Sequence, residues 1–588
     1  MVRELEPVSF YNRLRESASL SSSSPLLIFP STSDVDSLCA LKIVTHVLSS
    51  DSIRYSCYPI SSFAEVDRLA GSSLRSDDHP ISILLINWGC HRDLRRILNL
   101  GPLARVFVID SHRPIHLHNL SSRNGQVVVL YTRNDEAIAD VSYGVDVSEL
   151  ADAVDLDSDD EFGDESDSDL DDDSDDSESD ADEDEDGRRR KRRRRSGESD
   201  VDRKKREYYR LGSFHGKPSG CLMFDVSNSL RKNTNELLWL ACVSLTDQFV
   251  HERLTNERYR DGADELEHHI NSSGNLDAVM SITLKDGTKI RAPDASRIAY
   301  EEEPRLMLLR EWTLFDSMLC SSYIATKLKT WSDSGLKRLK LALATMGFSL
   351  LDCQQKYQYM SSEVKENMKG EFKRLLPQLG LEEVYYRSFV RLHGYGSKVS
   401  AADVVYGVTA LLESFTESKG SSAEQFWYAY SALSLGNLDK LRKGMHSAIQ
   451  IQRAILRQGS CAITKSGYIR SSRKFRWLKI EDAVDTNLLG YPQALTKFCY
   501  FLMDALLEKG AKMKPLICAC LTPDPSKVLV VGIPGRPKFM QGNRFGNAFR
   551  AAAEQIEAEF FHELFESSWI ILDRVAVNSF MIRVSEKL

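Results

Sequence analysis

The sequence predicts an α/β protein of several domains, with a mostly parallel sheet first, a helical middle region next and a second α/β unit last. Short apolar runs alternate with helical patterns before residue 150, and a mixed pattern returns after residue 458. The length of 588 residues agrees with this division, because one hydrophobic core rarely serves so long a chain.

The first domain, residues 1–150, is predicted from its apolar runs. The expected strands are residues 26–29, 53–60, 81–88, 106–109 and 127–131. Helical spacing follows the first strand at 35–44 and separates the next ones at 63–70 and 93–100. Apolar strands alternating with helices indicate a mostly parallel sheet that is covered on both faces.

An insertion is predicted at residues 151–206, because almost nothing in it can be buried. Residues 152–186 contain 22 acidic residues and no basic one, and two basic clusters follow. We expect disorder here. The clusters have the form of a bipartite nuclear-import signal, or they are a solvated charge run that balances the acidic one. They consist of Arg188, Arg189, Arg190, Lys191, Arg192, Arg193, Arg194, Arg195, Arg203, Lys204, Lys205 and Arg206.

Three further segments complete the predicted organisation. Residues 207–303 finish the first domain, with an apolar helix at 237–250 and a hairpin at 281–291 around Asp286-Gly287. Residues 304–457 are predicted to be helical, with Pro304 in a first helical turn and an apolar stripe that Gly347 ends. Residues 458–588 are expected to hold strands at 516–521, 528–533, 569–577 and 579–584 and a helix at 545–565.

The composition excludes several classes of protein. The net charge of −9 comes from the insertion, and the remaining chain is close to neutral, so it is not a generically basic nucleic-acid binder. No signal peptide is expected at the start, and no apolar segment is long enough to span a membrane. Eleven scattered cysteines without a CxxC pair are typical of reduced thiols in an intracellular protein.

Polar residues follow the predicted strands, where an open parallel sheet binds its ligands. Asp34 and Asp36 come after the first strand, Asn87 after the third, and Asp110-Ser111-His112 after the fourth. Carboxylates and imidazoles at one sheet edge would suit a two-metal phosphoester site. In the simpler alternative, the first two aspartates cap the following helix, and Asp110 and His112 form a hydrogen-bonded pair that fixes a loop.

These motifs resemble a known family. The stretches 26–37, 85–89 and 108–114 resemble the DHH phosphoesterases, which include the RecJ single-strand exonucleases. Residues 110–114, Leu-Thr-Asp247-Gln and the stretch 309–318 are more similar to the cell division control protein 45 family of eukaryotic replication factors. The resemblance implies a DHH-type domain at the start and a DHHA1-like α/β domain at the end.

Departures from the catalytic pattern imply a vestigial site. The family's metal ligands would require His at Pro30, Asp at Asn87 and His at Ser111, so only Asp34, Asp36 and Asp247 remain. His112 matches the signature histidine that faces the phosphate. Asp247 is either a former ligand or a buried structural acid. A dinuclear metal centre is therefore not expected, and neither is any other cofactor.

The resemblance implies a non-catalytic scaffold subunit of the replicative helicase, located in the nucleus. Its partners would be the minichromosome-maintenance hexameric ring and the GINS complex, with single-stranded DNA and replicative polymerases as further possibilities and no membrane. Two alternatives stay open: a metal-dependent single-strand DNA exonuclease or phosphodiesterase with an altered site, and an acidic histone or chromatin chaperone.

Two surfaces are candidates for these contacts. Cations alternate with aromatics in a stretch that suits single-stranded nucleic acid, although a surface strand with snorkelling basic side chains would look the same. This stretch contains Lys465, Arg470, Arg473, Lys474, Arg476 and Trp477. Residues 542–550 occupy the position of the family's glycine-containing substrate loop, or form a tight turn. Protein docking is expected through exposed aromatic and apolar residues of the helical region, among them Trp312, Phe315, Met318, Tyr323 and Trp331.

Overall fold

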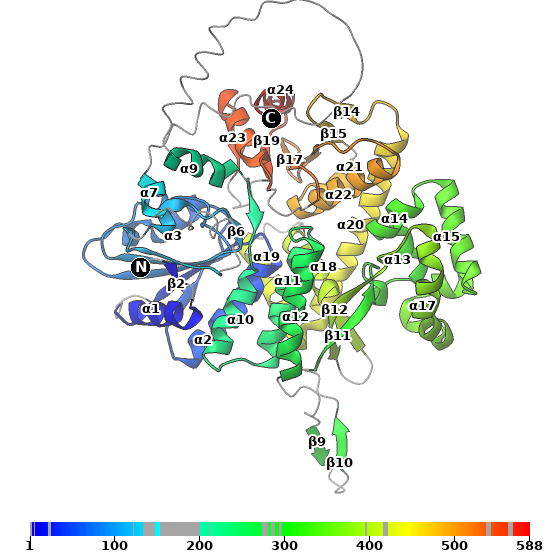
Figure 1. Ribbon diagram of the computed structural model, residues 1–588, viewed down its shortest axis with the longest axis horizontal. Helices are drawn as coiled ribbons and strands as arrows, with labels where there is room; N and C mark the ends of the chain where they lie inside the picture. The colour runs from blue at the N-terminus through cyan, green and yellow to red at the C-terminus, as the bar shows by residue number, and fades with distance from the viewer. Residues whose placement is uncertain are drawn as a thin grey trace, which may run out of the picture.

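The computed structural model contains two six-stranded sheets and a helical region beside them (Figure 1). It describes residues 3–4, 6–20, 25–121, 123–132, 147–152, 200–210, 212–272, 280–283, 289–292, 297–393, 397–414, 422–481, 483–536, 542–562 and 568–588. The acidic tract and the first basic cluster, residues 188–195, lie outside these ranges.

The N-terminal sheet is parallel throughout, as the sequence predicts, with the strand order β1-β7-β5-β4-β2-β3. Its strands are β1 (Arg3–Glu4), β2 (Leu26–Pro30), β3 (Tyr55–Cys57), β4 (Ile81–Ile86), β5 (Ala104–Ile109) and β7 (Val127–Leu130). The expected strand at 53–60 is reduced to β3. All six residues of β4 are buried, which is what helices on both faces of a sheet require.

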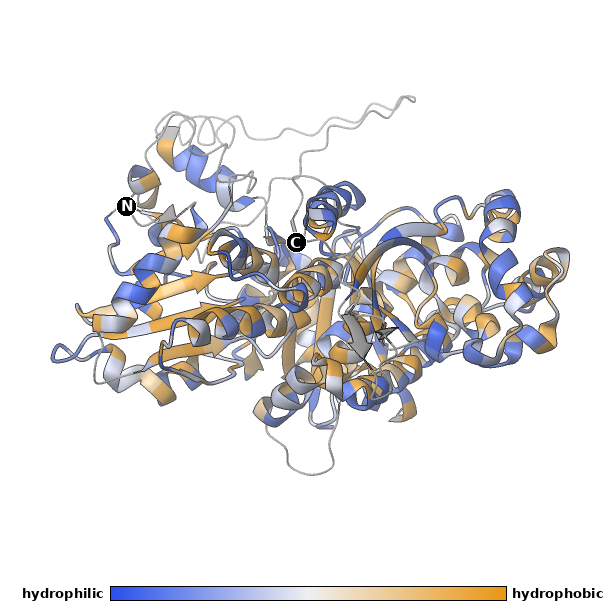
Figure 2. Cartoon of the chain, turned by 90° about the horizontal axis from the view of Figure 1, so that it is seen from below, coloured by the Kyte–Doolittle hydropathy of each residue, from blue (hydrophilic) through white to orange (hydrophobic). Residues whose placement is uncertain are grey.

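Helices cover both faces of this sheet and form two separate cores. On one face lie α1 (Pro7–Leu20), α2 (Val35–Ser50), α10 (Ser219–Ser229) and α11 (Asn235–Val250). On the other lie α3 (Phe63–Leu74), α4 (Leu94–Ile97), α5 (Leu117–Leu120), α7 (Val147–Asp152) and α9 (Asp200–Arg210). The strands are coloured largely hydrophobic in Figure 2, as expected for a sheet buried on both sides.

Helix α9 corrects the prediction that the unstructured insertion extends to Arg206. Its last turns carry Tyr208, which is buried and whose hydroxyl donates a 2.7 Å hydrogen bond to the Ile115 carbonyl. The neighbouring Tyr209 hydroxyl accepts the Leu117 N–H at 3.1 Å. Two tyrosines give the end of the basic segment an apolar face, and burial of that face stabilises a helix that charge alone would not.

The middle region is less purely helical than predicted. A three-stranded antiparallel sheet joins β11 (Ile298–Pro304), β12 (Tyr385–His393) and β13 (Ser397–Ser400). Pro304 ends β11 and does not start a helix, which also corrects the boundary between residues 303 and 304. The pairing of β11 with β12 joins residues 81 to 93 positions apart, so no local pattern indicates it. The hairpin strands β9 (Met280–Thr283) and β10 (Lys289–Ala292) pair as predicted, and their expected turn lies outside the described residues.

The helices that follow β11 have a core of their own. They are α13 (Leu314–Cys320), α14 (Ser322–Leu328), α15 (Asp333–Thr345), α16 (Leu350–Gln354) and α17 (Ser362–Leu375). This core buries Phe315 and Met318, and Trp312 is buried in the larger core that contains α2, α10 and α11, which corrects the expectation of exposed aromatics. Tyr323 accepts the Glu383 N–H at 3.0 Å, and Trp331 packs edge-on against Phe501. Among the described residues of 304–457, the exposed large apolar side chains are Leu341, Leu350, Leu351, Tyr359 and, on α19 (Ser422–Ala432), Trp427 and Tyr428.

The C-terminal α/β unit has the strand order β14-β15-β16-β17-β19-β18, and only β15 and β16 pair in parallel. Its elements are β14 (Arg470–Ser471), β15 (Arg476–Ile480), α22 (Pro492–Glu508), β16 (Leu516–Leu521), β17 (Lys527–Ile533), α23 (Phe545–Gln555), β18 (Phe560–Phe561), β19 (Trp569–Asp573) and α24 (Val577–Lys587). The long helix α20 (Leu438–Thr464) connects this unit to α18 (Ala401–Leu412).

Two elements of this unit correct the sequence prediction. Residues 579–584 belong to helix α24, because Val577, Phe580, Met581 and Val584 are buried at helical spacing. The helix expected to reach residue 565 ends at Gln555, and β18 follows. Within the described residues, no helix is long and apolar enough to cross a membrane.

Candidate functional site

The polar residues predicted to meet at one sheet edge do meet there. Pro30, Ile86 and Ile109 pair with one another across three parallel strands, so the chain leaves β2, β4 and β5 at the same level. Asn87 and Asp110 are the first residues after their strands, and the Asn87 N–H donates to the Ile109 carbonyl at 2.7 Å. The carboxyl end of the sheet is therefore lined by these side chains.

Asp34 is the N-cap of α2, as the simpler alternative predicts. Its Oδ1 accepts the Ser37 N–H at 2.7 Å, and its Oδ2 accepts the Ser33 hydroxyl at 2.9 Å. Burial raises the pKa of this carboxyl, the nearby Asp247 raises it further, and Arg253 opposes both. A cap of this kind satisfies an N–H at the helix start that has no partner within the helix.

Asp36 does not cap its own helix but holds the start of another. Its Oδ2 accepts the Ser219 N–H and its Oδ1 the Gly220 N–H, both at 2.8 Å, and the Ser244 hydroxyl also donates to Oδ1. Ser219 and Gly220 are the first residues of α10, which has no side-chain cap of its own. Burial, followed by repulsion from Asp34, raises the pKa of Asp36 to about 7.

Asn87 links three segments through one oxygen. Its Oδ1 accepts the Ser111 hydroxyl at 2.7 Å, the Ser111 N–H at 3.2 Å and the Ser219 hydroxyl at 2.8 Å. Its backbone is left-handed, with φ 59°, a conformation that Asn tolerates better than most residues. Asn87 and Ser111, two positions where the resemblance implies metal ligands, are thus hydrogen-bonded to each other.

Asp110 and His112 form the hydrogen-bonded pair that the alternative predicts. Asp110 Oδ1 lies 2.7 Å from His112 Nδ1 and accepts the His112 N–H at 3.0 Å, while Oδ2 accepts the Cys90 N–H at 2.9 Å. Burial opposes the charge, but His112 and these N–H donors outweigh it and lower the pKa of Asp110 to about 2. The pair fixes the loop after β5.

Asp247 is a buried acid that is held by basic neighbours. It lies in α11, where its Oδ1 is 2.9 Å from His251 Nδ1 and its Oδ2 accepts a 3.3 Å hydrogen bond from Arg253. Burial favours the neutral acid, yet these two residues keep the pKa of Asp247 below its usual value. Asp247 is either a former metal ligand or a structural acid, and both alternatives stay open. In this structure its carboxylate contacts His251 and Arg253.

Several residues of this cluster were missed by the sequence analysis. Ser219 had a signal, because Lys-Pro-Ser-Gly before an apolar run is a plausible helix start. Ser244, Arg253 and His215 had none: they come from α11, the turn after it and β8 (Phe214–His215), and only the fold brings them to the sheet edge. The His215 ring centroid is 5.0 Å from that of His112.

This donor set does not fit a pair of metal ions. The oxygens of Asp36, Asn87 and Asp110 accept N–H and O–H groups of the protein, and Arg253 supplies positive charge beside Asp34 and Asp247. Two cations about 3.5–4 Å apart need several anionic and imidazole ligands that face a common centre. Metal binding here would require α10 to lose its cap.

The predicted nucleic-acid stretch forms the edge of the C-terminal sheet. Lys465, Arg470, Arg473 and Lys474 are exposed. Arg470 lies over the ring of Trp477 at 4.7 Å, and Arg476 donates to the Lys512 carbonyl at 2.8 Å. One face of the indole is therefore already occupied, so this edge offers charge more than a stacking platform.

The segment at the position of the substrate loop joins the two α/β units. Asn543 and Ser213 exchange backbone hydrogen bonds of 2.7 and 2.9 Å, and Arg544 donates to the Arg210 carbonyl at 2.9 Å. Gly212 has φ +74°, and a Cβ there would lie 2.9 Å from the Asn543 oxygen. The close approach of the two chain segments therefore requires glycine at 212.

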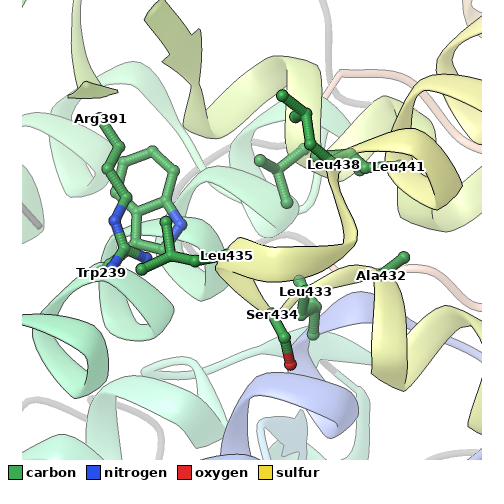
Figure 3. A pocket seen from close by; sticks show the side chains of 9 residues that line it. Trp239, Arg391, Ala432, Leu433, Ser434, Leu435, Leu438 and Leu441 are labelled. Atoms are coloured by element: carbon green, nitrogen blue, oxygen red, sulfur yellow. The ribbon is translucent and has the colours of Figure 1, made fainter. Parts of the chain in front are cut away.

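A small pocket lies elsewhere, between α11, β12 and the start of α20 (Figure 3). Its volume of about 20 Å³ holds about one water molecule. Four of its nine lining residues are leucines, and Arg391 stacks over the Trp239 ring at 5.8 Å. None of the strand-end residues lines it, so it offers them no substrate cavity.

Comparison with known proteins decides the family. The family model of CDC45, cell division control protein 45, matches residues 26–587. The chain belongs to the CDC45 family. A Schizosaccharomyces pombe protein named cell division control protein 45 homolog is 30% identical over 100% of this chain and 99% of its own length. The Homo sapiens homolog is 30% identical over 92% of this chain and 93% of its own.

A solved structure agrees with the fold. The crystal structure of CDC45 from Entamoeba histolytica superposes with a TM-score of 0.71 at 18% identity, covering 99% of each chain. The predicted α/β architecture, with a parallel first sheet and a second α/β unit at the end of the chain, is thereby confirmed. Membership of the family supports a role in DNA replication and the cell cycle.

Proposed function

We propose that this chain is a non-catalytic scaffold subunit of the eukaryotic replicative helicase. In this role it joins the minichromosome-maintenance ring and the GINS complex in the nucleus during initiation and elongation of replication. One observation carries the proposal: the carboxylates at the strand ends accept hydrogen bonds from other parts of the protein and so stabilise the fold. Asp36 supports it best, because both its oxygens accept donors at the start of α10 and Ser244.

The energetics favour a structural role for Asp36. A buried donor that loses its partner costs about 1–3 kcal/mol, and Asp36 serves three donors. A hydrolytic site would need the same oxygens to face a metal ion and a water molecule. A residue cannot cap α10 and ligate such a metal centre with the same lone pairs, so we assign it to scaffold stability.

We propose that the helical region carries a docking surface for the helicase partners. Leu341, Leu351 and Tyr359 have 68%, 76% and 74% of their surface exposed, on α15, on α16 and in the turn that follows. Exposed apolar side chains mark protein interaction sites, and tyrosine is among the residues enriched at interface hot spots. The buried Phe315 and Met318 pack in the core beneath α15 and α16 and do not contact a partner.

We further propose that the edge strand β14 and the turn before β15 contact single-stranded DNA. Three exposed cations on this sheet edge, Arg470, Arg473 and Lys474, support phosphate contacts without base recognition, and Lys465 lies nearby in sequence at the end of α20. The Arg470–Trp477 pair favours a backbone contact over base stacking. This contact would keep the unwound strand beside the helicase and needs no chemistry.

Reconstitution with purified ring and GINS tests the scaffold. The variant Asp36→Asn keeps an amide oxygen at the start of α10 but removes the anionic ligand that a catalytic metal centre would need. We expect it to assemble with ring and GINS and to support unwinding as well as the wild type. A matched variant, Leu351→Glu, should lose assembly while its thermal stability is unchanged. Loss of unwinding in fully assembled Asp36→Asn would overturn the proposal, because only a catalytic role predicts it.

A further inference from the structure

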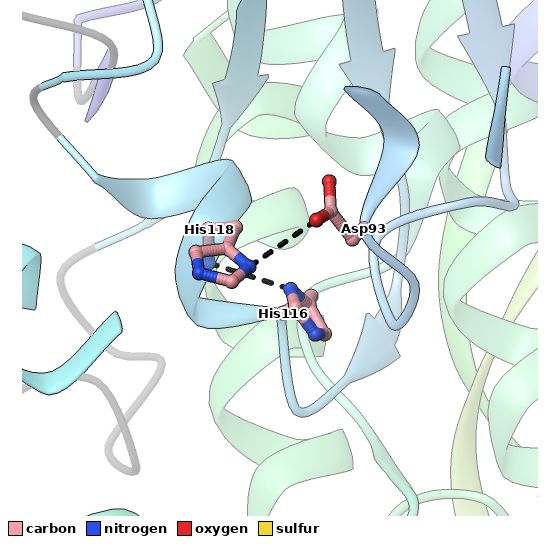
Figure 4. A group of neighbouring side chains, drawn as sticks. All are labelled: Asp93, His116 and His118. Carbon is pink, nitrogen blue, oxygen red and sulfur yellow. Dashed lines mark hydrogen bonds and ion pairs between the residues drawn. The ribbon is translucent and has the colours of Figure 1, made fainter. Parts of the chain in front are cut away.

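Three side chains outside the strand-end cluster gather around one point (Figure 4). They are Asp93, in the loop after β4, and His116 and His118, at the start of α5. Their potential metal-ligand atoms all lie within 4.8 Å of one another, and among the described residues no other such group of three occurs. All three side chains are half-buried, so the point is shielded from bulk solvent yet reachable.

The geometry is already close to that of a coordination shell. Asp93 Oδ2 lies 3.2 Å from His118 Nδ1. Two ligands at tetrahedral positions around Zn²⁺ stand about 3.3 Å apart, given metal–ligand bonds of about 2.0–2.1 Å. His116 Nδ1 accepts the His118 N–H at 3.4 Å, a long hydrogen bond that places its ring beside the other two. Only a small movement of the His116 ring would bring its nitrogen to a third ligand position.

The carboxylate is oriented by its own backbone contact. Asp93 is the N-cap of α4, and its Oδ1 accepts the Arg96 N–H at 3.3 Å. This bond leaves Oδ2 facing His118. Ligands whose second atom is held by the protein in this way are characteristic of metal sites.

A buried asparagine ties the two loops together. The Asn119 amide donates to the Cys90 carbonyl at 3.1 Å and to the Arg92 carbonyl at 2.6 Å, and its oxygen accepts the Leu94 N–H at 3.2 Å. The His116 N–H also donates to the Cys90 carbonyl, at 2.7 Å. The three ligands are therefore mounted on one rigid unit, which lowers the cost of ordering them around an ion.

We propose that Asp93, His116 and His118 bind one zinc-class divalent cation, with water in the fourth position. Two imidazoles and one carboxylate suit Zn²⁺ and exclude the oxygen-rich shells that Mg²⁺ and Ca²⁺ prefer. The site is separate from the strand-end cluster, whose Asp110 and His112 are paired with each other.

The ion would act on helix α9. Tyr209 of α9 accepts the Leu117 N–H, between the two histidines, and its ring centroid lies 6.2 Å from that of His116. An ion that fixes this loop therefore also fixes the surface on which α9 rests. The site thus anchors the chain where it returns from the charged insertion to the folded domain.

Zinc and cobalt titrations of the full chain test the site. Asp93→Asn retains a good N-cap but removes the anionic ligand, and His118→Gln removes one imidazole. His79→Ala, an exposed histidine elsewhere, is the control. We expect one zinc per chain in the wild type and the control, and affinity at least about 10-fold weaker in both site variants, each folded by circular dichroism.

Cobalt distinguishes this site from the cysteines. Bound Co²⁺ should give the visible bands of a nitrogen- and oxygen-ligated ion without an intense thiolate charge-transfer band. The proposal is overturned if the wild type takes up no stoichiometric zinc or if both variants bind as the control does. A thiolate band would also overturn it, because the ion would then sit on cysteine.

Discussion

The raised pKa of Asp36 predicts a specific dependence of stability on pH. The carboxyl titrates at about 7 in the folded chain and near 3.8 when unfolded. The native state therefore binds the proton more tightly, and the stabilisation from protonated Asp36 is lost as pH rises through about 7. Between pH 5 and pH 8 this loss amounts to about 3 kcal/mol, since one pKa unit corresponds to about 1.4 kcal/mol. Asp36→Asn cannot titrate and should lack this term.

The assay is thermal unfolding of wild type and Asp36→Asn between pH 5 and pH 8. The melting temperature of the wild type relative to the variant should fall with rising pH, by about 2–3 °C if the whole chain unfolds together and by about 6 °C if the first domain unfolds alone. Asp439→Asn, whose side chain is 96% exposed, is the control and should show no such trend. If the melting temperature of the wild type relative to Asp36→Asn stays constant or rises with pH, the account of a buried Asp36 carboxyl with a raised pKa at the start of α10 is refuted.

Three further outcomes are expected. Arg473→Glu and Lys474→Glu should each weaken binding to single-stranded DNA, measured by fluorescence anisotropy. Each should also reduce the slope of log affinity against log salt concentration by about 0.7 for each phosphate that is no longer neutralised. An unchanged slope would show that this sheet edge does not contact DNA. Trp312→Ala should cost about 3–5 kcal/mol of stability, because its side chain is buried, whereas Leu351→Ala should leave the melting temperature unchanged; the reverse order would contradict the core described here. Neutralising residues 188–195 together with the basic cluster of α9 should reduce nuclear accumulation by microscopy, and normal accumulation would reject the import signal.

The strands and most helices of the first domain could be predicted from local pattern. Apolar runs with helical spacing between them mark β4, β5 and α3 with one end exact and the other within two to four residues, because both-sided burial leaves a strong signal. Non-local pairing left no such signal, so β11 and β12 were missed. The error at α24 has a different cause: a short apolar segment fits a strand or a helix, and Val577, assigned to the end of the preceding strand, is the first residue of the buried helical stripe.

The residues of the candidate site could largely be predicted from the sequence, but the hydrogen bonds and ion pairs that they form could not. Strand ends located Asp34, Asn87 and Asp110, because parallel strands deliver their next residues to one edge. That Asp36 caps a helix 183 residues later, and that Arg253 faces two acids, depends on tertiary packing alone. The aromatics of the helical region were assigned to the surface because the sequence does not show that the region has a core of its own.

The most direct test of the scaffold account is a cleavage assay on single-stranded DNA. The purified chain is incubated with end-labelled single strands and Mn²⁺ or Mg²⁺, beside a manganese-dependent RecJ exonuclease as positive control. The account predicts no release of nucleotides at any metal concentration that activates the control, because the strand-end oxygens are bound to protein donors. Metal-dependent cleavage by the wild type that disappears in Asp36→Ala would contradict it.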